Sequence, residues 1–141
     1  MMLEKAVSIC EERQKHIVSK DAKSSCEHRA HNLDENLVRH YRIDGIVIAG
    51  NTEKKCDFLL LNDDKKNAYL IELKGTHILT ALKQLERTEE LLRENLKIYT
   101  LNYRIVYKSN TQAIRSSEYT KFCKARKNRV KASTNILEET I

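Results

Sequence analysis

The feature that most constrains the fold is a pair of apolar segments joined by a short polar loop. CDFLLLN (56–62) and NAYLIELKG (67–75) have the composition of buried β-strands. The hexapeptide that joins them, Asn62 to Asn67, is polar and suits a hairpin loop. The pattern predicts an antiparallel β-hairpin over residues 56–75.

The register of this hairpin decides which side chains meet. If Leu61 faces Ala68 across the loop, Asp57 faces Glu72, and directly opposed Cβ atoms lie about 4.5–5.5 Å apart. Two carboxylates so placed repel each other unless a cation lies between them. Lys74 is two residues beyond Glu72, so strand alternation predicts that it shares the same face.

The rest of the chain alternates helical and strand-like patterns. We expect helices over 2–20, 33–41 (capped by Asn32), 77–97 and 117–130, and strands over 42–50 and 101–109. Three strands joined by short turns should be antiparallel, and a fourth that follows a crossover helix can pair in parallel. The expected fold is α/β (α+β): a mixed sheet flanked by helices, in one domain over 1–141, with 1–31 as an N-terminal helical extension.

Composition narrows the class of protein. The 141 residues suit one domain, and 40% hydrophobic with 33% charged residues is typical of a globular chain. No apolar run approaches the roughly 20 residues that span a bilayer, so we expect no membrane partner. Charges occur early in the chain, where a signal peptide would be apolar, and the four cysteines form no CxxC pair. A cytoplasmic protein with reduced thiols is therefore expected.

An excess of basic residues indicates a polyanionic partner. The net charge is +6, and the segment KFCKARKNRVK (121–131) contains no acidic residue. Its candidate nucleic-acid-binding residues are Lys121, Lys124, Arg126, Lys127, Arg129 and Lys131. A solvated helix face is the alternative interpretation.

The two opposed carboxylates favour a hard divalent cation, Mg²⁺ or Mn²⁺, which takes oxygen ligands and usually keeps several waters. Such an ion could polarise a phosphoryl oxygen and promote formation of a hydroxide nucleophile. Lys74 could orient the attacking water, accept its proton, or balance charge in the transition state. The sequence leaves these three roles open.

The residues C-D-F-L-L-L and Y-L-I-E-L-K-G, which contain Asp57, Glu72 and Lys74, resemble the PD-(D/E)XK nuclease superfamily. The resemblance implies a restriction-endonuclease-like core: helix, three antiparallel strands, helix, strand. It implies that Asp57 and Glu72 bind the metal and that Lys74 completes the signature. It also makes Gln84 a candidate catalytic residue and Glu35 a candidate metal ligand, ahead of Glu4, Glu11 and Glu12.

The leading hypothesis is a metal-dependent nuclease that hydrolyses phosphodiester bonds in nucleic acid, with DNA favoured over RNA. Because the chain is small, we expect structure-selective cutting, a homodimer, or a partner protein that directs it to its target. The alternative is a catalytically idle nuclease fold that acts as a binding module or inhibitor on a nucleoprotein complex. A zinc site at Cys26, His28 and His31 is disfavoured because only three ligands occur, at unusual spacing.

Overall fold

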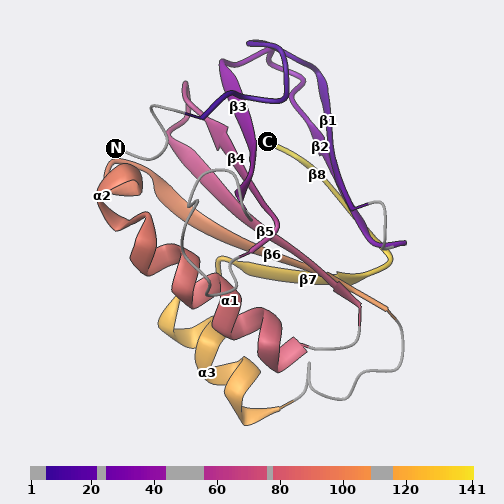
Figure 1. The fold of residues 1–141 in the computed structure, drawn as a ribbon, viewed down its shortest axis with the longest axis vertical. Coiled ribbons are helices and arrows are strands. Elements are labelled where there is room, and N and C mark those ends of the chain that lie inside the picture. The colour runs from indigo at the N-terminus through magenta and orange to yellow at the C-terminus, as the bar shows by residue number, and fades with distance from the viewer. Residues whose placement is uncertain (1–5, 22–24, 44–55, 76–77, 109–115) are drawn as a thin grey trace.

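The described part of the chain forms two mixed β-sheets and three helices (Figure 1). This computed structural model describes residues 6–21, 25–43, 56–75, 78–108 and 116–141, and only the backbone of Lys74 and Gly75. In chain order the elements are β1 (His16–Lys20), β2 (Glu27–His31), β3 (Val38–Arg42), β4 (Phe58–Asn62), β5 (Asn67–Gly75), α1 (Ile78–Leu91), α2 (Arg93–Leu96), β6 (Thr100–Tyr107), α3 (Ser117–Ala125), β7 (Val130–Thr134) and β8 (Ile136–Thr140). The α+β class is confirmed.

The larger sheet has the strand order β3-β4-β5-β6-β7. Strands β3, β4 and β5 are antiparallel, whereas β6 and β7 each pair in parallel with the strand before them. The parallel pairs follow the helical connections, because a parallel neighbour can be reached only by a crossover. The predicted hairpin register is confirmed: Leu61 pairs with Ala68, and Phe58 pairs with Ile71.

The predicted helix over 33–41 is wrong, because β3 occupies much of it. Val38 and His40 are buried while Arg39 between them is more exposed, which is strand alternation. Asn32 does not cap a helix. It stabilises the turn that leads into β3, because its Oδ1 accepts a hydrogen bond from the Asn36 amide at 3.0 Å. The strand predicted over 42–50 falls mostly outside the described residues.

The predicted N-terminal helix is also wrong. Residues 16–20 form β1, in which Ile17 and Ser19 are buried and their neighbours are exposed. β1 pairs antiparallel with β2, and β2 pairs in parallel with β8 from the other end of the chain. The predicted helical extension over 1–31 therefore contains two strands of a three-stranded sheet.

The long helix predicted over 77–97 is confirmed in position but is divided into α1 and α2. Its predicted apolar stripe is buried as expected: Ile78, Leu82, Leu85, Leu92 and Leu96. The basic helix α3 is capped by Ser116, whose side chain accepts from the Tyr119 amide. It ends at Ala125, before two positive-φ residues, Lys127 and Asn128. None of the helices in the described ranges is long and apolar enough to cross a membrane.

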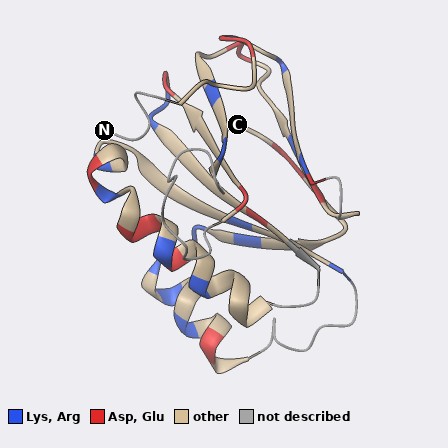
Figure 2. Ribbon diagram, viewed as in Figure 1, with Lys and Arg blue, Asp and Glu red and all other residues tan. Residues whose placement is uncertain are grey.

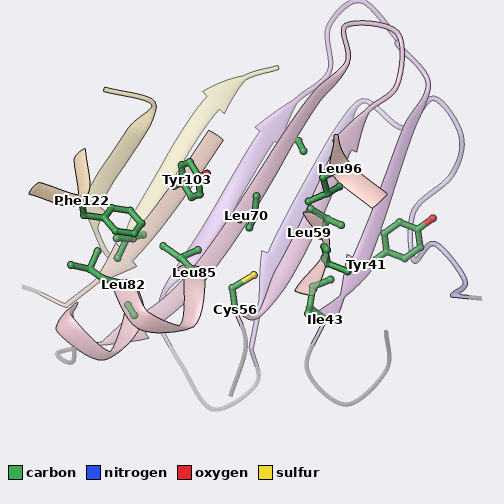
Figure 3. Packing of buried hydrophobic residues seen from close by; sticks show 14 of the residues in the cluster. Tyr41, Ile43, Cys56, Leu59, Leu70, Leu82, Leu85, Leu96, Tyr103 and Phe122 are labelled. Atoms are coloured by element: carbon green, nitrogen blue, oxygen red, sulfur yellow. The ribbon is translucent and has the colours of Figure 1, made fainter. Parts of the chain in front are cut away.

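The larger sheet is covered on both faces, which explains why all five residues of β4 are buried. On one face, α1 and α3 pack on Leu59, Leu70 and Tyr103 (Figure 3). On the other face lies the three-stranded sheet of β1, β2 and β8 (Figure 1). Its buried side chains pack on Phe58 and Leu60. The molecule thus has a helix-side core and a sheet-side core, separated by one sheet.

Candidate functional site

Asp57 lies at the end of the β4–β5 hairpin and is half-buried. Its amide donates to the Ile71 carbonyl at 3.1 Å, and its carbonyl accepts from the Ile43 amide at 3.0 Å. Its carboxylate reaches across to β5, where Oδ2 accepts from the Leu73 amide at 2.8 Å. The backbone of both neighbouring strands therefore fixes Asp57 beside the segment that contains Glu72.

Glu72 lies in β5, between β4 and β6, and is 1% exposed. Leu70 belongs to the helix-side core, whereas Ile71 and Leu73 belong to the sheet-side core. Strand alternation consequently places Glu72 on the helix-covered face. A carboxylate this deeply buried is costly unless it is protonated or paired with a cation, a metal or hydrogen-bond donors.

Helix α1 supplies the third predicted residue, Gln84, which is 7% exposed. The Thr88 hydroxyl, one turn later, donates to the Gln84 carbonyl and accepts from the Cys56 amide, both at 2.8 Å. These bonds attach the sheet-facing side of α1 to the chain just before Asp57. The structure thus brings Asp57, Glu72 and the helical turn that contains Gln84 to the same junction of β4, β5 and α1.

The pKa of the Cys56 thiol depends on the charge at this junction. Burial raises the pKa of Cys56 well above its ordinary value, and the negative charges of Glu72 and Asp57 raise the pKa further. Both carboxylates therefore act on the same buried thiol.

The two carboxylates suit a hard divalent ion that takes few of its ligands from the protein. Within the described ranges, no three His, Cys, Asp or Glu residues gather closely enough to hold a metal. Asp57 and Glu72 would supply carboxylate oxygens, and water would complete the shell, as is common for Mg²⁺. Lys74 belongs to β5, two residues after Glu72, and its side chain lies outside the described part.

Glu35 does not reach this junction, so its expected role as a metal ligand is wrong. It occupies an exposed turn with φ of 49° before β3. β3 begins opposite Asn62, at the other end of β4 from Asp57. Five strand residues separate the two ends, about 17 Å. Glu12 lies at the same far end, because its carbonyl accepts from the Val38 amide.

The predicted basic segment divides into α3, a turn and the start of β7, and Figure 2 shows its cations along α3. Five of its six basic side chains are exposed: Lys121, Lys124, Lys127, Arg129 and Lys131. Arg126 differs from them. Its guanidinium lies 3.8 Å from the Phe122 ring centroid and 5.1 Å from that of Tyr103, and its Nε is 3.4 Å from a Glu89 oxygen. Arg126 therefore packs against two aromatic rings and a carboxylate, and we no longer count it among the candidate nucleic-acid contacts.

Sequence reasoning missed a pocket of about 480 Å³ beside this segment. It opens between α1, the start of β6 and the turn after α3, and is lined by Glu89, Tyr99, Thr100, Leu101, Tyr103, Ala125, Arg126, Lys127 and Arg129. The only signal was the pair Tyr99 and Tyr103, whose spacing suggests aromatic side chains on one surface. Tyr103 donates its hydroxyl to Glu89, so it is held in place.

Cys26, His28 and His31, the alternative zinc ligands, do not converge on one point. Cys26 and His28 are fully buried, and His28 Nε2 lies 2.7 Å from a Glu139 oxygen. His31 points to the opposite face of β2, where its side chain is 29% exposed. These three side chains cannot share one ion.

Comparison with known proteins adds no relative: no family model, no curated protein and no solved structure matches the chain. The resemblance to PD-(D/E)XK nucleases therefore stays a prediction from the sequence motif.

Proposed function

We propose that the protein is a metal-dependent nuclease that hydrolyses phosphodiester bonds, with DNA as the favoured substrate. The observation that carries this proposal is the placement of Asp57 and Glu72 at the end of the β4–β5 hairpin, next to the turn of α1 that runs from Gln84 to Thr88. The strand order β3-β4-β5-β6, with the crossover helix before β6, is the order that the resemblance implies. The main departure among the described residues is β3, which stands in the region of the first helix that the resemblance implies.

The roles of the residues follow from their positions. Asp57 and Glu72 would hold Mg²⁺ or Mn²⁺, which when bound polarises a phosphoryl oxygen and lowers the pKa of its water. The Leu73 amide fixes Asp57 Oδ2 and so orients the carboxylate. Lys74 would orient the water, accept its proton or balance charge. Gln84 would position water or phosphate through its amide.

The cleavage test uses single-stranded, duplex, nicked and branched DNA and RNA, with Mg²⁺, Mn²⁺ or EDTA. We expect metal-dependent cutting that falls on the order of 10³-fold in Asp57→Asn, Glu72→Gln and Lys74→Ala. Glu86→Gln is the matched control, since Glu86 is an exposed carboxylate on α1. Thermal melting checks that each variant is folded. Cutting that survives in EDTA or in all three variants contradicts the proposal.

A second candidate is a catalytically idle binding module or inhibitor. The burial of Glu72 under α1, together with only two acidic ligands among the described residues, favours it. In that case no metal supports cutting, while nucleic-acid or nucleoprotein binding is the same for the wild type and Glu72→Gln.

The exposed basic residues give a separate prediction about binding. Lys127→Ala/Arg129→Ala should weaken DNA binding and reduce the slope of log K against log salt by about 2, because each duplex phosphate contact contributes about 0.9. Fluorescence anisotropy at several salt concentrations measures this slope. Lys15→Ala/Lys20→Ala removes two exposed lysines from the region of β1 and should leave it unchanged. Equal slopes in both variants would exclude the segment as the binding surface.

A further inference from the structure

Two histidines face each other on the outer side of the three-stranded sheet. His16 of β1 is the direct cross-strand partner of His31 in β2. Their Nδ1 atoms are 3.0 Å apart, and the rings meet edge to face with centroids 5.2 Å apart. One proton joins the two nitrogens in this arrangement, so one Nδ1 donates it and the other accepts it.

A carboxylate from the third strand orients one of these rings. Glu138 of β8 lies 2.8 Å from His31 Nε2 through its Oε2. An ionised carboxylate only accepts hydrogen bonds, so His31 carries its proton on Nε2 and offers the lone pair of Nδ1. A carboxylate behind an imidazole, with the other ring nitrogen free to coordinate, is the usual outer shell of a metal-bound histidine.

We propose that His16 and His31 form a transition-metal site that binds Zn²⁺ or Cu²⁺ through the two Nδ1 atoms. Imidazole is a preferred ligand for both ions. Two nitrogens at 2.0–2.1 Å from a metal lie about 2.9 Å apart at a right angle and about 3.3 Å apart at a tetrahedral angle. The present separation of 3.0 Å lies within that range. On metal binding the shared proton leaves His16 Nδ1, and neutral His16 takes the tautomer that carries its one proton on Nε2.

The site is open to solvent and separate from the proposed nuclease site. His16 is exposed and the His31 side chain is 29% exposed, so an ion has direct access and water can fill the remaining coordination positions. Its nitrogen ligands select a different class of metal from the oxygen ligands Asp57 and Glu72. Bound metal would join β1 to β2, and the proposal does not depend on the nuclease activity.

The test is titration of the metal-free protein with Cu²⁺ or Zn²⁺ by calorimetry, in excess Mg²⁺. We expect one ion per chain, loss of this binding in His16→Ala and in His31→Ala, and roughly tenfold weaker binding in Glu138→Ala. The Cu²⁺ electron paramagnetic resonance spectrum should show two coordinating nitrogens in the wild type. His77→Ala is the control, because it removes a histidine that lies outside the described residues.

Binding that survives in either single histidine variant overturns the proposal, and so does a wild type that binds neither ion. Circular dichroism of the metal-free variants shows whether they fold, and His16→Gln and His31→Gln replace any alanine variant that does not. Loss of Zn²⁺ binding in Glu72→Gln, with His16→Ala unaffected, would assign the ion to the hairpin site instead. Failure of the nuclease proposal leaves the titration unchanged, so the two results are separable.

Discussion

Glu139→Ala is expected to lower the free energy of unfolding by about 3–5 kcal/mol, the usual cost of removing one partner from a buried ion pair. Glu139 Oε2 accepts from Arg104 Nε and lies near His28 Nε2, both at 2.7 Å. The side chains of all three are at most 8% exposed. Removal of the carboxylate leaves a buried guanidinium without its anion, in the core between the two sheets.

Urea denaturation in EDTA measures this loss, and Glu138→Ala is the matched control. Glu138 precedes Glu139 on β8, but its side chain is 52% exposed and pairs with His31 at the surface. Loss of such a surface pair costs at most about 1 kcal/mol. If Glu139→Ala changes stability no more than Glu138→Ala does, the buried network does not hold the sheets together.

The pKa of Glu139 is lowered by the same interaction. Burial alone would raise its pKa, but hydrogen bonds from His28 and Arg104 outweigh burial and bring the pKa to about 2, from an ordinary value of 4.5. At about 1.4 kcal/mol per unit, the difference corresponds to roughly 3 kcal/mol. Because the folded pKa is depressed, this stability is present above about pH 4.5 and is lost as the pH falls towards 2.

The candidate site and the Glu139 network lie on opposite faces of neighbouring strands. Ile71 pairs with Arg104, and Glu72 pairs with Ile105. Arg104 faces the second sheet, whereas Glu72 lies on the face that α1 covers. One sheet therefore carries a polar network in each of its two cores, and a variant in one need not disturb the geometry of the other.

Local sequence was sufficient for the elements whose partners are close in the chain. The hairpin register could be predicted because the polar loop leaves few ways to pair Leu61, and α1 could be predicted because its apolar spacing is long and regular. β1 could not, because its partners are β2 and, through β2, the distant β8. Without knowledge of these partners, the mixture of charged and apolar residues around β1 is also compatible with an amphipathic helix.

The same distinction applies to function. Asp57, Glu72 and Gln84 could be proposed from the sequence because hairpin register and helical period are local properties, and the structure confirms the register. Glu35 was misplaced because its position depended on a helix that does not form. Arg126 was grouped with its neighbours by charge, although ring contacts set its role, and the His16–His31 pair required the fold of the first sheet. Composition identified the basic segment but not which cations are exposed.

The second large effect is a loss of stability in mild acid that depends on His40. This residue of β3 is 3% exposed, stacks on Phe58 with ring centroids 5.1 Å apart, and has Nε2 2.8 Å from the Ser19 hydroxyl. Burial, together with the smaller effect of positive charge on His28 and Arg42, lowers its pKa from 6.5 to about 4. Only neutral His40 therefore fits the core at moderate pH.

The sign of the effect follows from which state takes up the proton. Between about pH 6.5 and pH 4 the unfolded chain protonates His40 and the folded chain does not, so the free energy of unfolding falls as the pH falls. At about 1.4 kcal/mol per pH unit, the contribution of His40 is about 2 kcal/mol between pH 7 and pH 5. Glu139 adds little between pH 7 and pH 5, because its contribution is lost mainly below about pH 4.5.

Urea unfolding at both pH values should show a change about 2 kcal/mol smaller in His40→Gln than in the wild type. His16→Gln, which alters an exposed histidine, should retain the full change. If His40→Gln retains it as well, His40 is protonated within the folded protein and the sheet-side core is more accessible to water than its burial indicates.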